Sequence, residues 1–586
     1  FHAQPNACPV CGPQVALHDR EKKRIETKNA IETTISLLKN GHVVAVKGLG
    51  GFHLVVDAEN TAAVETLRKR KHREEKPLAV MSGDIERVRQ FALVAKENEV
   101  LLQSRQRPIV LLEKKKDYAL AKGVSPKNRT VGVMLPYTPL HYLLVKDHFT
   151  ALVMTSGNLS EEPIAIDNTD AFDRLRDIAD YFLIHDRDIY LRSDDSVLRI
   201  VDGKQRFLRR SRGYVPAPIF LKNRLKPILA CGAELKNTVC LTRETHAFLS
   251  QHIGDLENLA TYEFFEMTIA HLKRILSIEP EIIAHDMHPD YLSTRYAVEQ
   301  GRMVKIDVQH HHAHIVSCMA ENHVEEPVIG LAFDGTGYGR DDSLWGGEVL
   351  IARLDSFERA AHLAYTPMPG GAAAIKEPWR MAVAYLYGAY GKAFVNRRLP
   401  FLDKLSESKR NIMVEMMEKE INSPRTSSLG RFFDGIAAIL GIRSHVAFEG
   451  QAAMELEMLA EPWTGDPYEY TWSSEEPVQV DPHPIITGVV RDIEKGVPSS
   501  VVSGKFHATL MAMFTDLCQV IGKKTGLSQV ALSGGCFQNA ILLAGLTRRL
   551  DDKGFHVLTH ERVPVNDGGI ALGQAVIADA IVRRTG

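Results

Sequence analysis

The chain has 586 residues, which is too long for one hydrophobic core, so three or four domains are expected. Its residues are 45% hydrophobic and 25% charged, with a formal net charge of −2. This balance argues against a dedicated nucleic-acid-binding protein, whose affinity for phosphates would need an excess of positive charge. No apolar run approaches the roughly 20 residues needed to cross a bilayer, so no membrane partner is expected.

The beginning of the chain contains half of a possible zinc site. It opens FHAQPNACPVCG, without an initiator Met, so we interpret it as a fragment of a longer protein. Cys8 and Cys11 form one CxxC knuckle, whereas a tetrahedral zinc site needs two such pairs. Residues 1–20 are therefore predicted to be the remnant of a zinc-finger region, with structural Zn²⁺ expected only in the longer chain. A plain turn with two thiols is the alternative.

The cysteine content indicates the compartment. The seven cysteines are spread over the length and form no disulfide-like framework, which predicts a reducing, cytoplasmic setting. The sequence also begins without a secretory signal. Cys231, Cys240, Cys318 and Cys518 stand among apolar residues, so we expect buried thiols there.

Residues 21–217 alternate helical patterns with short apolar strands, which predicts an α/β domain. Lys47 opens the segment KGLGGFH between two apolar runs, so a cation and flexible backbone lie together at a strand end. The block closes with RSDDS, which runs from Arg192 to Ser196, and with RRSRGYVP, which begins at Arg209. These two segments are weaker candidates for a binding surface.

A basic run within this block has two possible meanings. The residues from Arg68 to Lys76 form either a solvated helix face or a phosphate-binding surface. The second interpretation is the sharper one because a proline and a buried strand follow at once. Further on, Ser156 and Asn158 end a predicted strand, where their neutral hydrogen bonds could orient a nucleotide or a small acid.

The pattern of the chain restarts after a predicted proline-bounded linker at residues 218–227. ILACGAELKNTVCLT has the pattern of a strand, a turn and a strand, and about a hundred residues later VIGLAFDGTGYGRDDSLWGGEVLIA repeats this layout. Two such units predict a duplicated α/β domain with a cleft between its lobes, residues 228–327 and 328–586. The second lobe carries a predicted helical insert at about 376–445.

A histidine-rich segment lies near the junction of these lobes. His310, His311, His312 and His314 head a stretch that is predicted to be helical, and the first and last of them are four residues apart. Both imidazoles would then project from one helix face toward a single metal ion. The next strand ends in Asp334. Alone, each piece is more often a core helix or an ordinary hairpin, but together they favour a metal–phosphate site.

Glycine-rich turns supply backbone groups to the same candidate site. The predicted DGTGYG turn begins with Asp334, the GGCFQN turn ends another strand, and the turn VNDGG places a second acid, Asp567, before the last helix. Backbone N–H groups in such turns, and a helix N-terminus, can approach an anionic group. The residues that we predict to bind a nucleotide in this way are Gly335, Gly337, Gly534, Gly535 and Asn539.

These motifs resemble those of two known families. Positions 21–217 resemble the YrdC/Sua5 family through Lys71-x-Arg73, Lys76-Pro77 and Ser156-x-Asn158. Positions 228–586 resemble the carbamoyltransferases of the ASKHA (actin-like) fold, relatives of TsaD and TobZ, through the two hairpins, the His310/His314 pair and the GGCFQN and NDGG turns.

The order of the two parts is similar to that in the HypF family, the carbamoyltransferases of [NiFe]-hydrogenase maturation. The resemblance spans nearly the whole chain, and the combination is far more specific than any single motif. Members begin with an acylphosphatase domain and two zinc fingers of the CxxC…CxxC type, and only the last knuckle, Cys8/Cys11, matches here.

The resemblance implies an activity. The family is understood to release carbamate from carbamoyl phosphate, to adenylate it with ATP and the accompanying Mg²⁺, and to pass the carbamoyl group to the C-terminal cysteine thiolate of HypE. Dehydration there gives the precursor of the cyanide ligands. Without the first domain, we expect this chain to adenylate carbamate but not to hydrolyse carbamoyl phosphate itself.

Roles for single residues follow from this chemistry. Adenylation brings a carboxylate against a triphosphate, so cationic groups are the expected catalysts. We assign Lys71, Arg73 and Lys76 to that step, Lys47 to the pocket rim, Ser156 and Asn158 to orientation, and Arg192, Ser196 and Arg209 as weaker candidates. In the second block we predict a metal, Zn²⁺ or Fe²⁺, held by His310, His314, Asp334 and Asp567. His311 or His312 would help deprotonate the thiol or pack the helix.

Three other readings of the sequence stay open. A TobZ-like transferase acting on a small-molecule hydroxyl, or a threonylcarbamoylation enzyme acting on tRNA, would keep the chemistry and change the acceptor. A metallopeptidase is the second, although the HExxH arrangement is absent. The third is a double-stranded RNA-binding module built on residues 68–76, which would bind with a steep salt dependence.

Overall fold

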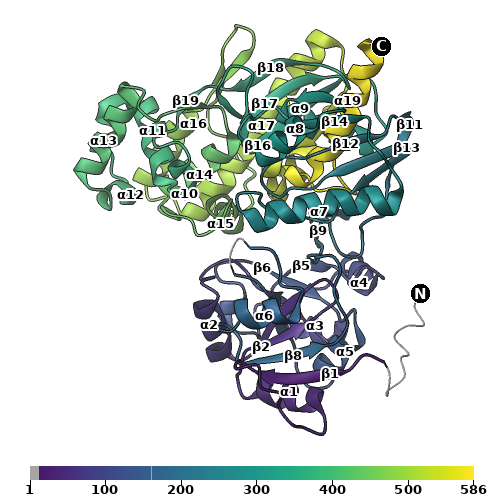
Figure 1. Ribbon diagram of the computed structural model, residues 1–586. Coiled ribbons are helices and arrows are strands. Elements are labelled where there is room, and N and C mark those ends of the chain that lie inside the picture. Colours follow the sequence, from purple (N-terminus) through teal and green to yellow (C-terminus); the bar gives the residue numbers. More distant parts are fainter. Residues whose placement is uncertain (1–11, 160–161, 586) are drawn as a thin grey trace. The chain divides into compact units, whose positions relative to one another are not determined.

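The computed structural model describes residues 12–159 and 162–585, so Cys8 and Cys11 lie outside the described residues. The chain forms two compact units, one of residues up to 217 together with 250–272, and the other of residues 218–249 together with 273 onward (Figure 1). None of the helices in the described ranges combines the length and the apolar character that a membrane crossing requires.

The first unit is built on one ten-stranded sheet, in the order β1-β8-β2-β3-β7-β4-β6-β5-β9-β10. Its central strands are apolar on both faces, so both faces need a cover. Helices α2, α3, α4 and α6 bury one face, and α1 and α5 bury the other. The strands are β1 (Val15–Asp19), β2 (Val44–Lys47), β3 (Phe52–Asp57), β4 (Ala79–Met81), β5 (Ile109–Glu113), β6 (Thr130–Met134), β7 (Leu152–Ser156), β8 (Tyr181–His185), β9 (Val197–Val201) and β10 (Lys204–Arg209). The helices are α1 (Ala30–Lys39), α2 (Thr61–Arg70), α3 (Ile85–Phe91), α4 (Lys96–Gln103), α5 (Pro139–Val145) and α6 (Asn168–Arg174), with the 3-10 turn η1 (Lys122–Val124).

Two predicted boundaries are wrong. Val15–Asp19 form β1, which pairs antiparallel with β8, so the described end of the supposed zinc-finger remnant completes the edge of the first sheet. The supposed linker, residues 218–227, is mostly strand β11 (Ile219–Leu225), which pairs antiparallel with β13. Its alternating burial shows a strand with one face on a core and one in solvent, which its prolines concealed in the sequence.

The second unit contains two sheets with a repeated topology, as the duplicated actin-like fold predicts. In each sheet an antiparallel hairpin, β12–β13 or β16–β17, is followed by two parallel strands, β14 and β15 or β23 and β24. The first sheet has the order β11-β13-β12-β14-β15 and the second the order β21-β22-β18-β17-β16-β23-β24. The strands are β12 (Ile228–Ala230), β13 (Cys240–Leu249), β14 (Ile282–Asp286), β15 (Val304–Val308), β16 (Val328–Tyr338), β17 (Leu344–Ala352), β18 (Phe357–Leu363), β19 (Thr366–Pro367), β20 (Arg425–Thr426), β21 (Thr471–Trp472), β22 (Val478–Asp481), β23 (Gln529–Ser533) and β24 (His556–Leu558).

Two long helices cross between these sheets and share one core. Helix α9 (His310–Glu321), which follows the first sheet, packs on β16, β17 and β23 of the second, and α19 (Ile570–Thr585) packs on β12, β13 and β14 of the first. The two helices lie side by side (Figure 1). They approach so closely that a Cβ on Gly573 would overlap the backbone oxygen of Ala313. This crossing brings residues from both ends of the unit together.

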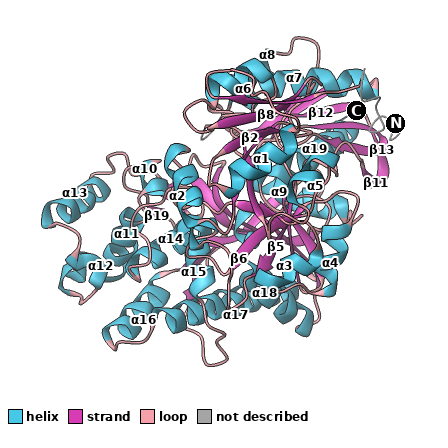
Figure 2. Cartoon of the chain, turned by 90° about the horizontal axis from the view of Figure 1, so that it is seen from below, coloured by secondary structure: helices cyan, strands magenta, loops and turns pink. Residues whose placement is uncertain are grey.

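The remaining helices include those of the predicted insert. Helices α10 to α14 and α16 gather on one side of the unit (Figure 2). The helices and 3-10 turns are α7 (Leu259–Leu276), α8 (Leu292–Glu299), α10 (Ala373–Lys376), α11 (Trp379–Tyr390), η2 (Gly391–Asn396), α12 (Pro400–Asp403), α13 (Glu407–Glu418), α14 (Leu429–Ile439), α15 (Gln451–Leu459), α16 (His483–Glu494), α17 (Ser499–Thr525), η3 (Gly535–Gln538), α18 (Ala540–Asp552) and η4 (Asp567–Gly569).

Candidate metal centre and basic pocket

Helix α9 presents two histidines to the interior of the second unit. Its N-cap is Gln309, whose side-chain oxygen accepts the N–H of His312 at 2.9 Å, so the helix begins at His310. His310 and His314 therefore lie one turn apart, and each is only 1% exposed. Buried imidazoles require polar partners.

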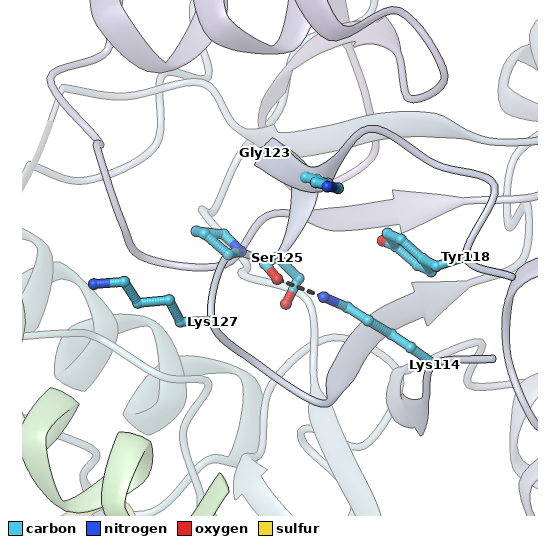
Figure 3. Close-up of a pocket in the computed structure, with 7 residues that line it drawn as sticks. Lys114, Tyr118, Gly123, Ser125 and Lys127 are labelled. Atoms are coloured by element: carbon cyan, nitrogen blue, oxygen red, sulfur yellow. Dashed lines mark hydrogen bonds between the residues drawn. The ribbon is translucent and has the colours of Figure 1, made fainter. Parts of the chain in front are cut away.

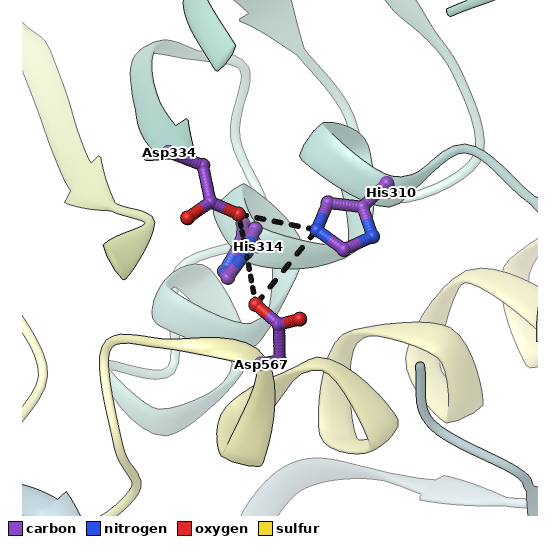
Figure 4. A group of neighbouring side chains, drawn as sticks. All are labelled: His310, His314, Asp334 and Asp567. Atoms are coloured by element: carbon purple, nitrogen blue, oxygen red, sulfur yellow. Dashed lines mark hydrogen bonds and ion pairs between the residues drawn. The ribbon is translucent and has the colours of Figure 1, made fainter. Parts of the chain in front are cut away.

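The partners of these histidines are two carboxylates (Figure 4). Asp334 lies on β16, and Asp567 lies in η4 immediately before α19. The Nε2 atoms of His310 and His314 lie 3.2 and 3.3 Å from Asp334 Oδ2. Asp567 Oδ1 lies 3.6 Å from His314 Nε2, and one ligand atom of each residue falls within 4.8 Å of the other three. Two imidazole nitrogens and two carboxylate oxygens suit Zn²⁺ or Fe²⁺, so the residues fit the predicted metal, whose binding stays a prediction.

A third carboxylate, which sequence reasoning missed, orients the first histidine. Asp286 at the end of β14 is fully buried, and its Oδ2 lies 2.8 Å from His310 Nδ1. This contact leaves His310 Nε2 directed at the cluster, as outer carboxylates do for metal-binding histidines. One signal could have indicated a role for Asp286, namely its position at the end of the first parallel strand of its sheet.

The charges of the cluster favour a cation. Burial lowers the pKa of His310, but Asp286, Asp334 and Asp567 outweigh burial and hold that pKa well above its ordinary value. Burial raises the pKa of Asp334, but its hydrogen bonds to His310 and His314 hold it well below its ordinary value. The surplus of negative charge can be balanced by protons or by a divalent ion.

The other two histidines of α9 lie outside the cluster. His312 Nε2 lies 2.7 Å from the backbone oxygen of Arg353, and burial lowers the pKa of His312 to about 4. The suggested role of His312 toward a thiol therefore has no support in the geometry. His311 packs beside His310, with ring centres 5.2 Å apart, and burial holds its pKa well below its ordinary value. A Cβ on Gly337 would overlap the His311 ring, so that glycine permits the close packing.

Two glycine N–H groups hold Asp334 in place, and the predicted DGTGYG turn is mostly part of strand β16 (Val328–Tyr338). The N–H groups of Gly335 and Gly535 donate to Asp334 Oδ1 at 2.8 and 3.1 Å. These N–H groups therefore serve the carboxylate in this arrangement and not the predicted phosphate. Gly534 has φ of 105°, and a Cβ there would overlap the Phe333 oxygen, so the turn requires glycine.

The side chain of Asn539, which was predicted to bind a nucleotide, makes contacts within the fold. Its Oδ1 accepts the N–H of Leu542 at 3.0 Å and so caps α18, while its Nδ2 lies 2.9 Å from His507 Nε2.

Glu449, which had no predicted task, forms an ion pair with Lys236. The backbone oxygen of Lys376 accepts the N–H of Val446 at 3.0 Å.

The cysteines of this unit behave as expected. Cys231, Cys240, Cys318 and Cys518 are all buried, which confirms the prediction. Cys536, beside the Gly534–Gly535 turn, is held with a pKa well above its ordinary value by burial and by Asp334. Such a thiol is a poor nucleophile.

In the first unit, Lys71, Ser156 and Asn158 form one hydrogen-bonded cluster. Lys71 caps the end of α2 and is 2% exposed. Its Nζ donates to the backbone oxygens of Ser156 and Asn158 at 2.6 and 2.7 Å, and to Asn158 Oδ1 at 2.8 Å. Burial, followed by the charges of Arg73 and Lys76, holds the pKa of Lys71 well below its ordinary value. An anion nearby would relieve this positive potential.

The loop after Lys71 is fixed by arginines. Arg73 donates to the Pro77 oxygen at 2.6 Å and to Thr155 Oγ1 at 3.2 Å. Arg68, which had no predicted role, is 7% exposed and donates to the oxygens of Arg73 (2.7 Å) and Gly123 (2.5 Å). Arg68 and Lys71 of the basic run are thus buried, whereas Lys69 and Lys76 are exposed, so the run is partly internal and partly a solvated face.

The remaining predicted residues of this unit do not all join the cluster. Lys47 donates to the His185 oxygen at 3.2 Å, and Arg192 donates to the Ile164 oxygen at 2.9 Å. Ser196 is fully buried between the Arg212 oxygen and the Ser211 N–H, at 2.9 and 2.8 Å, so its role is structural. Arg209 pairs with Asp194 at 3.3 Å and lowers the pKa of Arg73, after burial and Arg68. Of these four, Arg209 is the one whose charge acts on the basic loop, through Arg73.

A hollow of about 360 Å³ opens in the same unit (Figure 3). Lys114 Nζ donates to the Ser125 oxygen at 2.5 Å and lies 4.7 Å from the Tyr118 ring centre, and burial lowers the pKa of Lys114 to about 8. Three lysines and no carboxylate line the hollow, which suits an anion. Gly123, which lines the hollow, accepts a hydrogen bond from Arg68 through its backbone oxygen and so connects the hollow to the basic loop. The lining residues are Lys114, Tyr118, Lys122, Gly123, Ser125, Pro126 and Lys127.

Comparisons with known proteins agree with both units. Residues 36–211 match the Sua5/YciO/YrdC family, described as "Telomere recombination". Residues 223–321 match the HypF Kae1-like domain, and residues 330–574 match the second subdomain of the carbamoyltransferase Kae1-like domain.

Several carbamoyltransferases match nearly the whole of this chain. The carbamoyltransferase HypF of Synechocystis is 45% identical over 96% of this chain and 74% of its own length. HypF2 of Cupriavidus necator is 42% identical over 96% of this chain and 75% of its own. A crystal structure of full-length HypF in a phosphate- and nucleotide-bound form superposes with a TM-score of 0.95, at 47% identity, over 99% of this chain and 76% of that one. The chain thus spans about three quarters of these relatives, and it belongs to the HypF carbamoyltransferase family.

Proposed function

We propose that this chain activates carbamate with ATP in its first unit and transfers the carbamoyl group, in its second unit, to the C-terminal cysteine thiolate of HypE. The observation that carries the proposal is the convergence of His310, His314, Asp334 and Asp567 within a chain whose first unit holds a buried Lys71. Membership of the HypF carbamoyltransferase family supports the reaction class.

Activation is needed because carbamate would otherwise have to expel oxide. A carbamate oxygen attacks the α-phosphorus of ATP, the bond to pyrophosphate breaks, and carbamoyl-adenylate forms. Lys71, which contacts Asn158, and Arg73, which contacts Thr155, would offset the negative charge that accumulates during this step. No side chain of the first unit has to form a covalent bond.

Transfer follows in the second unit. The HypE thiolate attacks the carbonyl carbon, the carbon–oxygen bond to the phosphate breaks, and AMP leaves with the electron pair. A divalent ion held by His310, His314, Asp334 and Asp567 would offset the charge of that phosphate. Asp286 orients His310, and two glycine N–H groups orient Asp334.

Two variants test this division of labour. ATP–pyrophosphate exchange is measured in ammonium carbamate for the wild type, Lys71→Ala and His310→Ala, and transfer is measured to a HypE C-terminal peptide. We expect Lys71→Ala to lose exchange, and His310→Ala to keep most of the exchange and lose transfer. Exchange that survives in Lys71→Ala, or transfer that survives in His310→Ala, would contradict the proposal. Transfer to tRNA or to a small-molecule hydroxyl, with the peptide ignored, would identify a different acceptor.

A further inference from the structure

The first turn of α14, within the helical insert, contacts the part of strand β16 that carries Asp334. Ser428, the N-cap of α14, has its Oγ 2.9 Å from the Asp334 backbone oxygen and 2.7 Å from that of Gly335. A Cβ on Gly430 would lie 2.8 Å from the Gly335 Cα, so the helix approaches the strand as closely as glycine allows. The insert therefore forms a wall of the candidate metal centre.

Arg431, the next residue of this turn, has a guanidinium group with fewer hydrogen-bond partners than nitrogens. It is 5% exposed, and its Nη2 pairs with Asp434 Oδ2 at 3.0 Å. Its Nε and Nη1 are buried and have no hydrogen-bond partner among residues 12–159 and 162–585. A buried guanidinium that leaves two of its nitrogens unbonded is unfavourable unless something else binds them.

The position of this group relates it to the metal centre. A Cβ on Gly335 would lie 3.6 Å from Arg431 Nη2, so the guanidinium lies over the residue that follows Asp334. Its charge also reaches Cys536, whose pKa it lowers against the larger effects of burial and Asp334. Arg431 thus lies against the Asp334–Gly335 segment of β16.

Asp434 pairs with only one of the three guanidinium nitrogens of Arg431 among the described residues. Burial raises the pKa of Asp434 above its ordinary value even though Arg431 opposes this, so the carboxylate holds its charge less readily than a surface aspartate. Arg431 also lies in the first turn of α14, where the helix dipole adds positive potential. Both features favour a further anion at this position.

We propose that Arg431 binds the phosphate of a nucleoside monophosphate ester, the AMP portion of the acyl-adenylate, through Nε and Nη1. The planar fork of a guanidinium matches two oxygens of a phosphate. As AMP leaves, the charge that builds on the phosphate lies against Arg431, and no proton has to move. The inference rests on the proposed function, because it requires the adenylate to reach the second unit.

The test distinguishes two roles of Arg431: binding a phosphate, and neutralising the charge of Asp434. AMP binding is measured by calorimetry on full-length chains that all carry Lys71→Ala, so that the first unit contributes little. To this reference we add Arg431→Met, Asp434→Asn, the double variant Arg431→Met/Asp434→Asn, and Arg443→Met. The last is a matched control, because Arg443 forms a part-buried pair with Glu455 at 2.5 Å elsewhere in the same unit.

We expect the dissociation constant for AMP to rise roughly 10- to 100-fold in Arg431→Met and in the double variant, as for loss of charge-assisted hydrogen bonds. Asp434→Asn and Arg443→Met should stay within about threefold of the reference, which is the general scatter of single contacts. The double variant removes the buried pair as a neutral unit, so it reports on binding even if Arg431→Met unfolds. AMP binding by the double variant at the reference affinity, or no AMP binding by the reference itself, would overturn the inference.

A second readout is independent of Lys71→Ala. In an otherwise wild-type chain, Arg431→Met should keep ATP–pyrophosphate exchange and lose transfer to the HypE peptide. If the wild type performs neither reaction, the proposed function fails, whereas the AMP-binding result still decides the role of Arg431.

Discussion

In the first unit the cationic residues come from one short stretch, Arg68 to Lys76, whereas in the second unit His310 and His314 meet Asp567 from the far end of the chain. The first cluster is held by side-chain bonds to nearby backbone oxygens, such as those of Arg68 to Arg73 and Gly123. The second depends on the crossing of α9 and α19. The first cluster can therefore be disrupted by removing one side chain that braces it, such as Arg68. The second cluster depends on the packing of the whole core of its unit.

The largest expected effect is the loss of a ligand of the second cluster. In His314→Ala, metal affinity should fall by more than the roughly 100-fold that loss of an outer hydrogen-bond partner costs, because a donor atom itself is removed. Bound Zn²⁺ and Fe²⁺ are measured after dialysis against buffered metal. His312→Ala is the matched control, since His312 contacts the Arg353 oxygen and not the cluster. Equal metal loss in both variants would contradict the assigned ligand set.

Removal of Arg68, which braces the first cluster, should affect the stability and the exchange activity of the first unit and not the second unit. Arg68→Met leaves several backbone oxygens without their donor, so the free energy of unfolding of the first unit should fall by about 3 kcal/mol. Pyrophosphate exchange should fall with it, while metal binding by the second unit is unchanged. Urea unfolding followed by a probe in each unit measures this. Arg70→Met, at a less buried arginine of the same helix, should cost less.

Asp286 offers a milder change in the second unit. Asp286→Asn keeps the shape but weakens the charge that orients His310, so metal affinity should fall roughly 10- to 100-fold. Competition with a chelator of known affinity measures the change. An unaltered affinity would mean that the carboxylate does not act through His310.

The smallest expected effect is a pH dependence in the first unit. Burial lowers the pKa of Lys114 to about 8, below the value of about 10.4 for an unfolded lysine. Between these values the unfolded chain binds more protons, so stability should rise with pH from about 8 to about 10.4. Lys114→Met should flatten this rise in a thermal melt, whereas Lys122→Met, at an exposed residue of the same hollow, should not. A rise of equal size in the Lys114 variant would exclude Lys114 as its source.

Much of the fold followed from patterns that are local in the sequence. The strand–turn–strand repeat predicted the duplicated sheets, and the four-residue spacing of His310 and His314 predicted that they share a helix face. The failures also have local causes. The prolines around residues 218–227 suggested a linker where β11 forms, and the N–H groups of Gly335 and Gly535 were assigned to a phosphate although they bond Asp334.

The sequence by itself determined which chemical groups exist and which of them share a strand or a helix, because strand and helix periodicity depends on neighbouring residues. It therefore identified the two histidines, the two cluster carboxylates and the basic run. Only the tertiary structure decided that Asp286 supports His310 and that Arg431 lies over Gly335 with two unbonded nitrogens. These relations depend on how separate elements pack against one another, and no local pattern records the distance between residues that are remote along the chain.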